Sequence, residues 1–535
     1  MRDFHLPGRS AVYAANAMVA TSHPIAVEVA LGELRAGGNA VDAAIAGAVA
    51  LGLGEPAMTG IGGDMFALVK PAGSEQVLGL NACGRAPAAL SAEALRAKGW
   101  SEMDPDDANS VVVPGAIKGF DVLMAAHGTR GLAAAFAPTI KLAEEGMPVM
   151  PRPAFDWVRN PPRMTGAMAR WYLPWGRAPR PGDLFRHQGQ AEVLRRIGIE
   201  GAKGFYEGEV AEDMIASLNA LGGTHTAEDF ATVTADWVDP ISGPYRGAEL
   251  IELPPNTHGP TAILMARILE HFDIAAMDPF GAERAHLETE AAKLAYAVRD
   301  QAIGDPAAMT ETLETLTGAP LAAKLAAMID PEAALDPPAD ALGATLSDGA
   351  ALQHKETIYI TVVDRDRMAV SLIYSVYHDF GSCIASEKFG INFNNRAAGF
   401  TLKPGHPNEA GGGKRPMHTI IPAMLRQGGQ VVMPFGVMGG GYQPHGHCRL
   451  ISNMLDFGMD PQAAQDMPRL FYDGEFTRLE NGYGADVWRS LSHKGHRVAA
   501  RQVPLGGSQA IWIDHDRGML IGGTDPRKDG LAHGY

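Results

Sequence analysis

Residues 354–375 read HKETIYITVVDRDRMAVSLIYS, two apolar runs joined by a short polar one. Residues 357–363 and 368–375 are rich in β-branched and aromatic residues, which favour strands, and the polar run 364–367 separates them. The pattern predicts an antiparallel hairpin. Hairpins of this kind occur in many protein cores. The pattern alone therefore leaves open whether these strands only form core or also carry a functional residue. The rest of the chain decides between the two interpretations.

The segment before the hairpin, residues 305–355, is rich in Ala, Leu and Pro and carries scattered acidic residues. This composition is typical of a flexible linker between domains. We therefore expect the segment to be exposed and mobile.

The overall composition excludes several classes of protein. Of the 535 residues, 46% are hydrophobic and 20% are charged, as in soluble globular proteins, and no apolar run reaches the roughly 18 residues of a membrane helix. The formal charge of −16, without clusters of Lys and Arg, argues against a nucleic-acid partner. The N-terminus lacks the apolar core of a secretion signal, so we expect a cytoplasmic protein.

Neither a disulfide framework nor a metal site is indicated. Cys83, Cys383 and Cys448 are widely spaced and form no CxxC pair, so we interpret them as reduced thiols. His445 and His447 form a short pair without a third ligand at a recognisable spacing. The sequence therefore implies no metal and no cofactor.

The N-terminal region predicts a buried helical pair followed by a glycine-rich turn. Ala, Leu, Ile and Val dominate residues 23–52, and the run 37–39, Gly-Gly-Asn, interrupts them. Residues 55–63 then lead through a Gly-Ile-Gly-Gly turn into an apolar strand. A phosphate-binding loop is disfavoured, because no Lys-Ser/Thr follows the glycines and the next element reads as a strand. We interpret these glycines as positions of close backbone packing.

Short motifs follow one another along nearly the whole chain. They are GGNAVDAA (37–44), EP (55–56), GIGG (60–63), VPGA (113–116), GFYEG (204–208), LPPNTHG (253–259), ETEAAKLAYA (288–297) and GTDPR (523–527). Each motif is short, but in this order they resemble the γ-glutamyltransferase family. The resemblance implies an α+β fold, the four-layer αββα sandwich of the N-terminal nucleophile hydrolases.

Members of that family are made as one inactive chain that cleaves itself before a Thr. The matching bond here joins Glu356 to Thr357. Cleavage would give a large subunit, residues 1–356, and a small subunit, residues 357–535, which associate as one αββα domain. In the family the segment before the nucleophile is extended and is freed by processing, which is an alternative to the linker interpretation of residues 305–355.

The chemistry of an N-terminal Thr needs no separate base. A Thr hydroxyl is a weak nucleophile until a base takes its proton. A free α-amino group titrates at about 7.7 to 8.0, so the amine of Thr357 can take that proton itself. A Ser-His-Asp triad is therefore unnecessary, and no GxSxG element supports one.

Three further residues match catalytic positions of the family. Gly439 and Gly440 follow an apolar run and resemble the glycine pair whose N–H groups stabilise an oxyanion. An ordinary tight turn is the alternative for these glycines. Ser375 falls where the family places a hydroxyl beside the nucleophile's amine, and a solvent-facing strand residue is the alternative.

The residues that match the family's substrate-binding positions are mostly different here. The carboxylate-binding Arg falls on Cys83, although Arg85 follows two residues later, and the family's Asn falls on Tyr377. The family's Gln and its amine-binding Asp fall on Arg396 and Gly399, and its Ser pair falls on His418 and Thr419. Losing the acidic partner of an ammonium while gaining Arg396 favours a substrate anion without an α-amine. Arg85 and Arg396 are candidates to bind its carboxylate through a bidentate fork.

These departures resemble the divergent branch of the family that includes oxamate amidohydrolase and cephalosporin acylase-like members. The sequence therefore predicts an autoprocessed Thr-nucleophile amidohydrolase that cleaves a small carboxylate-bearing amide through an acyl-enzyme. Two alternatives stay open. One is a γ-glutamyl hydrolase or transferase that acts on glutathione and γ-glutamyl amides. The other is an unprocessed, non-catalytic relative that keeps the fold.

Overall fold

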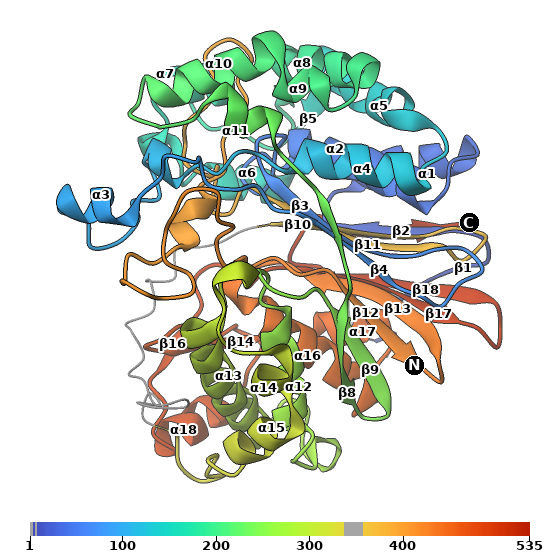
Figure 1. The fold of residues 1–535 in the computed structure, drawn as a ribbon. Coiled ribbons are helices and arrows are strands. Elements are labelled where there is room, and N and C mark those ends of the chain that lie inside the picture. Colours follow the sequence, from blue (N-terminus) through green and yellow to red (C-terminus); the bar gives the residue numbers. More distant parts are fainter. Residues whose placement is uncertain (1–3, 6–7, 336–356) are drawn as a thin grey trace.

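The computed structural model describes residues 4–5, 8–335 and 357–535. Two seven-stranded sheets lie face to face, and helices cover the outer face of each sheet (Figure 1). The first sheet contains, in spatial order, β19 (Leu531–Gly534), β2 (Met18–Thr21), β10 (Ile358–Val363), β11 (Ala369–Ser375), β3 (Asp64–Lys70), β4 (Leu78–Ala82) and β7 (Asp236–Val238). The second contains β1 (Val12–Ala14), β18 (Met519–Thr524), β17 (Ser508–Asp514), β13 (Gln430–Val437), β12 (Ala423–Gln427), β9 (Ala248–Glu252) and β8 (Ile241–Tyr245). The four-layer αββα arrangement that the resemblance implied is therefore confirmed.

The two helical layers come from different parts of the chain (Figure 1). The layer over the first sheet contains α1 (Pro24–Arg35), α2 (Ala40–Gly54), α4 (Ala116–His127), α5 (Gly131–Glu145), α6 (Pro151–Trp157), α7 (Gly166–Tyr172), α8 (Gln188–Glu200), α9 (Lys203–Tyr206), α10 (Gly208–Asn219) and α11 (Ala227–Ala231). The layer under the second sheet contains α12 (Gly259–Leu269), α13 (Ala282–Ala302), α14 (Leu313–Thr317), α15 (Ala319–Ala326), α16 (Gln443–Leu455), α17 (Pro461–Asp466) and α18 (Ala485–His493). Among the described residues, no helix is both long enough and apolar enough to cross a bilayer.

The remaining elements are short. The helix α3 (Ala92–Ala97) lies at one edge of the molecule (Figure 1). A two-stranded ribbon is formed by β5 (Met147–Pro148) and β6 (Leu184–Phe185), and a three-stranded sheet by β14 (Leu470–Tyr472), β15 (Thr477–Leu479) and β16 (Val498–Ala500).

The predicted hairpin is confirmed, and it lies at the centre of the first sheet. Its strands β10 and β11 pair antiparallel with Ile358 opposite Tyr374, and Asp364 accepts hydrogen bonds from the N–H groups of Asp366 and Met368 in the turn. Every residue of both strands is buried. Helices cover one face of this sheet and the second sheet covers the other. Both faces of each strand are therefore buried, which explains why its sequence is a continuous apolar run without alternating polar residues.

The predicted helical pair is also confirmed, as α1 and α2. Asn39 caps α2 by accepting from the N–H groups of Val41 and Asp42, while Asp42 accepts from the N–H of Asn39, which is a reciprocal capping box. The helix packs on β10 at Gly47, where a Cβ would lie 2.4 Å from Cδ1 of Ile360. The absence of that Cβ lets the helix approach the hairpin closely.

The linker interpretation of residues 305–355 is wrong for its first part. Residues 313–326 form α14 and α15, whose Leu316 and Leu325 are buried in the core of the lower layer. Tertiary packing overrides the Ala- and Pro-rich composition here. Residues 336–356 lie outside the described residues, and so does Glu356, the predicted residue before the cleavage point.

Both large sheets mix strands from the two predicted subunits. In the first sheet, β19, β10 and β11 belong to residues 357–535, and their neighbours β2 and β3 belong to residues 1–356. In the second sheet, β18, β17, β13 and β12 from the C-terminal part lie between β1 and β9 from the N-terminal part. The predicted subunits therefore share one core.

Candidate active site

Three polar side chains lie in one row across the first sheet. Thr357 comes directly before β10, and the pairing of Ile358 with Tyr374 places it opposite Ser375, the last residue of β11. Ser375 in turn lies opposite Asp64, the first residue of β3. The Oγ1 of Thr357 donates to the Oγ of Ser375 at 3.4 Å, and all three residues are at most 1% exposed. The row brings together the two hydroxyls that the sequence predicted.

The loop after β11 holds Ser375 from the other side. The Oγ of Ser375 accepts from the N–H of Tyr377 at 2.8 Å, and the Nη2 of Arg396 lies 3.5 Å away. Tyr377 has a φ of +87°, a left-handed conformation that strains a residue with a side chain. Strain of this kind is kept mainly at functional sites, where the surrounding structure enforces it.

Arg396 is a fully buried cation beside this row. It begins the short 3-10 helix Arg396–Gly399, its guanidinium stacks on the ring of Tyr377 at 4.0 Å, and its Nη1 donates to Thr419 Oγ1 at 3.2 Å. Its Nε has no hydrogen-bond acceptor in the part of the chain described, and the Oδ2 of Asp64 lies 3.8 Å from it. Burial lowers the pKa of Arg396 from its ordinary value, but a guanidinium stays protonated at neutral pH. The site therefore contains a positive charge with an unused donor.

Asp64 is the nearest carboxylate to Arg396 among the residues that the structure describes, and burial and its hydrogen-bond donors shift its pKa in opposite directions. Its Oδ1 accepts from the N–H groups of Gly84 and Gly115, and its Oδ2 lies 3.3 Å from the Nε2 of His418. Burial raises the pKa of Asp64 to about 6, although Arg396 and the two N–H donors act in the opposite direction. Asp64 therefore changes its charge close to neutral pH.

His418 is neutral in this environment. Burial and the nearby cations Arg396 and Arg415 hold its pKa well below the ordinary value. Its Nδ1 accepts from the N–H of Ile420 at 3.3 Å, which leaves the proton on Nε2, where it faces Asp64. His418 is thus a hydrogen-bond donor to the carboxylate rather than a charged group.

Of the two candidate carboxylate-binding arginines, only Arg396 lies beside the row of Thr357, Ser375 and Asp64. The side chain of Arg85 is about half exposed, donates to the carbonyl of Gly413 and pairs with Asp236 and Asp305 at 4.0 and 3.8 Å. None of these contacts reaches the row formed by Thr357, Ser375 and Asp64. A buried arginine that the sequence reading missed, Arg415, donates to the carbonyl of Cys83 and pairs with Asp236.

The glycine turn 439–441 follows β13, a strand of the second sheet that faces the hairpin. A Cβ at Gly436 would lie 2.4 Å from the ring of Tyr359, so β13 and β10 are in direct contact two residues beyond Thr357. Gly439 and Gly440 have φ values of +111° and +55°, which glycine adopts without strain. Their N–H groups have no acceptor among the described residues. Both stand ahead of the N-terminus of α16, where the helix dipole favours negative charge.

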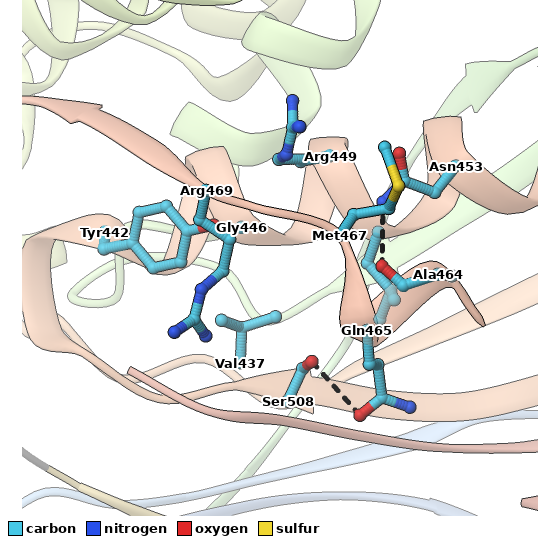
Figure 2. A pocket seen from close by; sticks show the side chains of 11 residues that line it. Val437, Tyr442, Gly446, Arg449, Asn453, Ala464, Gln465, Met467, Arg469 and Ser508 are labelled. Carbon is cyan, nitrogen blue, oxygen red and sulfur yellow. Dashed lines mark hydrogen bonds between the residues drawn. The ribbon is translucent and has the colours of Figure 1, made fainter. Parts of the chain in front are cut away.

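A small cavity behind this turn is not a substrate site. Its volume is about 20 Å³, and it lies between Val437, Tyr442 and the buried arginines Arg449 and Arg469 (Figure 2). Beside it, the hydroxyl of Ser508 donates to Gln465 at 3.1 Å. A volume of this size holds about one water molecule.

Two groups of side chains have the residue types of metal ligands. Asp64, Cys83 and His418 lie together, but the carboxylate already accepts two backbone N–H groups, burial raises the pKa of the thiol, and Arg396 and Arg415 are close. His286, Glu290 and His496 also lie together, but Lys293 is 2.8 Å from Glu290. Fixed positive charge makes both groups poor sites for a cation. The pair His445 and His447 faces two different carboxylates, Glu288 and Glu252.

The sequence reading missed Asp64 because its pairing with Ser375 spans more than 300 residues of chain. The only available signal was its position directly after the Gly-Ile-Gly-Gly turn, at the start of an apolar strand. A polar residue at the end of a buried strand is a common place for a functional side chain.

Known proteins are similar to this chain over nearly its whole length. The family described as gamma-glutamyltranspeptidase matches residues 26–535. A glutathione hydrolase-like proenzyme of Bacillus subtilis (YwrD) is 32% identical over 527 residues, which cover 97% of this chain and 98% of that protein. An oxamate amidohydrolase proenzyme of Klebsiella pneumoniae is 31% identical over 97% of this chain and 98% of its own length. The crystal structure of a cephalosporin acylase from Bacillus halodurans superposes with a TM-score of 0.91, at 37% identity, over 100% of this chain and 99% of that chain.

Proposed function

The chain belongs to the γ-glutamyltranspeptidase family and is an enzyme of the N-terminal nucleophile hydrolase type, and we propose that it is an autoprocessed amidohydrolase with Thr357 as its nucleophile. Its proposed substrate is an amide whose small acyl group carries a carboxylate. The observation that carries this proposal is the buried row of Thr357, Ser375 and Asp64 with Arg396 beside it.

The proposed reaction begins with processing. Hydrolysis of the bond between Glu356 and Thr357 consumes one water and frees the α-amine of Thr357. That amine then takes the hydroxyl proton while Oγ1 attacks the substrate carbonyl, and the proton passes to the leaving nitrogen as the amide bond breaks. Water, deprotonated by the same amine, hydrolyses the resulting ester. Ser375, which is within hydrogen-bond distance of Oγ1, holds the hydroxyl in place.

The proposed oxyanion site is the pair of N–H groups of Gly439 and Gly440. Donors of this kind are most useful when they are already oriented and have no other acceptor, because no reorganisation is then needed during the reaction. Both conditions favour these two groups.

The preference for a carboxylate rests on Arg396. Among the described residues, this fully buried guanidinium has an Nε–H without an acceptor and one carboxylate 3.8 Å away, so it gains from a second, closer anion. The name of one relative, oxamate amidohydrolase, fits such a substrate, and another relative is named an acylase. The position that corresponds to the family's amine-binding Asp is Gly399, which offers an α-amine no countercharge.

The second candidate, a γ-glutamyl hydrolase that acts on glutathione, is favoured by relatives of that name, such as the glutathione hydrolase proenzyme of Bacillus subtilis, which is 29% identical. The test is to purify wild-type protein and Thr357→Ala, identify their fragments by N-terminal sequencing, and assay oxamate, glutaryl amides and glutathione. We expect a wild-type fragment that begins at Thr357, activity on the first two substrates, and neither cleavage nor activity in Thr357→Ala.

Three results would count against the proposal. Glutamate release from glutathione with no activity on the other amides would establish the second candidate. Activity retained in Thr357→Ala would show that Thr357 is not the nucleophile. An intact wild-type chain without activity on any amide would indicate a non-catalytic relative. Thr357→Ser is the matched control, because it keeps a hydroxyl and an α-amine, and we expect it to process and to hydrolyse more slowly.

A further inference from the structure

The glycine turn 439–441 is held by its carbonyl oxygens, while its N–H groups meet no acceptor in the described part of the chain. The carbonyl of Gly439 accepts from the N–H of Tyr442 at 3.1 Å, and that of Gly440 accepts from the N–H of Gln443. The carbonyl of Gly441 accepts from the hydroxyl of Tyr296. Two of these donors belong to the residues that directly follow the turn, and the third comes from a distant helix.

Tyr296 lies on α13, in the large subunit, whereas the turn belongs to the small subunit. Its ring packs edge-on against Phe471 at 5.9 Å, and the guanidinium of Arg299 covers it at 4.4 Å. Phe471 also contacts Tyr442, the residue directly after the turn. Burial raises the pKa of Tyr296, so its hydroxyl keeps its proton and remains a donor.

The hydroxyl of Tyr296 is connected to the N–H of Gly440 through two peptide groups. The carbonyl that it holds belongs to the peptide between Gly441 and Tyr442, and the N–H of that peptide donates to the carbonyl of Gly439. That carbonyl belongs to the peptide whose N–H is the N–H of Gly440. Peptide groups are planar, so fixing one end of each fixes the other, and chained hydrogen bonds polarise one another.

We infer that Tyr296 is a positioning residue of the oxyanion site, through which the large subunit orients the N–H of Gly440 for the reaction at Thr357. The inference rests on the proposed function, because it takes these N–H groups as the oxyanion site. Tyr296 itself does not touch the reacting atoms in this assignment. Its contribution is the orientation of a flexible glycine turn, which has few side chains of its own to hold it.

The test compares Tyr296→Phe with Tyr472→Phe in the full-length protein. Phenylalanine keeps the ring contacts of Tyr296 and removes only the hydroxyl. Tyr472 is the matched control, because its hydroxyl also donates to a glycine carbonyl, that of Gly474 at 2.6 Å, outside the turn. For each protein, kcat and KM are normalised to the amount of small subunit that begins at Thr357. The affinity for a boronic acid analogue of the substrate, which forms a tetrahedral adduct with a nucleophilic hydroxyl, is measured as well.

We expect Tyr296→Phe to process normally and to lose about tenfold in kcat, less than the roughly hundredfold or greater loss when an oxyanion donor is removed outright. KM should change by less than about twofold, and the affinity for the boronic acid should fall by the same factor as kcat/KM. Tyr472→Phe should match wild type in every measurement. A parallel fall of kcat and boronate affinity is the signature of a misplaced oxyanion site, which a loss of stability does not produce.

Three outcomes would overturn the inference: wild-type kcat and boronate affinity in Tyr296→Phe, an effect confined to KM, or a failure to fold or process that Tyr472→Phe does not share. The failure of the proposed function can be told from the failure of this inference, because the two show in different variants. Activity that survives Thr357→Ala refutes the nucleophile, whereas a normal Tyr296→Phe in a Thr357-dependent enzyme refutes only the role of the tyrosine.

Discussion

At the scale of single residues, the site is defined by a buried cation whose one ion pair among the described residues is long. Arg396 has Asp64 at 3.8 Å, stacks on Tyr377 and leaves its Nε–H without an acceptor among the described residues. Breaking a buried ion pair costs several kcal/mol, on the order of 3 to 5, so a long pair leaves part of the charge of Arg396 uncompensated. A substrate carboxylate that enters this site relieves that cost, and this is the physical basis of the selectivity proposed above.

Replacing Arg396 by Met should remove the preference for a carboxylate. A charge-assisted hydrogen bond contributes about 1.5 to 3 kcal/mol, so we expect kcat/KM for a carboxylate-bearing amide to fall by about 10- to 100-fold. The corresponding uncharged amide should be hydrolysed at an unchanged or higher rate. Steady-state kinetics on the two substrates checks this. Arg426→Met, which removes a surface pair with Glu249, is the control, and an equal loss on both substrates would contradict the assignment.

Asp64 should make substrate binding depend on pH. Its pKa is raised to about 6, so the group is neutral below pH 6 and becomes a carboxylate as the pH rises. The carboxylate competes with the substrate for Arg396, so KM for an anionic amide should rise with pH above 6, by at most about tenfold per unit. KM for an uncharged amide should stay flat.

Asp64→Asn provides the matched test of this dependence. The amide oxygen can still accept from the N–H groups of Gly84 and Gly115, so the local backbone is kept while the titration is removed. We expect KM of the variant to be independent of pH between 5 and 7.5. If KM of Asp64→Asn still depends on pH, a group other than Asp64 causes the dependence.

Two of the predicted site residues lie together because local structure joins them. Thr357 and Ser375 face each other because a hairpin with a short turn has one register, and the register follows from the sequence. Asp64 reaches the site by pairing with Ser375, and Arg415 by donating to the carbonyl of Cys83; both contacts join segments far apart in the chain, which no local pattern encodes. Arg85 was a reasonable candidate by position, but its partners Asp236 and Asp305 are equally remote in sequence.

At the scale of elements, the contacts of the hairpin depend on glycines in the layers on both sides. Gly47 of α2 contacts Ile360 from the helical side, and Gly436 of β13 contacts the ring of Tyr359 from the second sheet. The helical pair and the hairpin were predictable because apolar patterns and capping residues are local signals. The two helices in residues 313–326 could not be predicted, because the composition of short Ala- and Leu-rich helices is also typical of a linker and only their packing distinguishes the two.

Gly436→Ala should destabilise the contact between the two sheets. The new Cβ would lie 2.4 Å from the ring of Tyr359, which is fully buried and has no space to move. Overpacking of this kind costs about 1 to 3 kcal/mol, so the temperature of unfolding should fall. Gly32→Ala is the control. Its Cβ meets nothing within 4 Å inside α1, so that substitution should be neutral or stabilising by about 0.5 to 1 kcal/mol. Differential scanning calorimetry distinguishes the two variants. A Gly436→Ala protein with the wild-type temperature of unfolding would show that the two sheets shift to accommodate the new Cβ.

At the scale of the whole molecule, cleavage before Thr357 would divide the chain without dividing the fold. Residues 357–535 supply β10 and β11 at the centre of the first sheet, flanked by β2 and β3 from the other part, and they supply four neighbouring strands of the second sheet. Separating the two chains would break the hydrogen bonds between neighbouring strands in both sheets. It would also expose the apolar core between the sheets, which includes Tyr359, Ile373 and Met424. Unpaired strand edges and exposed apolar surface are both strongly unfavourable in water.

We therefore expect the processed chains to remain associated without a covalent link. In size-exclusion chromatography the two fragments should co-elute at the position of the intact Thr357→Ala chain, even after large dilution, because the shared core has the character of a domain interior rather than of a reversible interface. Only denaturant should separate them, at the same concentration that removes the circular dichroism signal of the fold. Mixing a processed sample with an isotope-labelled one tests this further. Exchange of subunits under native conditions, detected by mass spectrometry of the intact complexes, would show that each fragment keeps a stable fold of its own, which the interleaved strand order argues against.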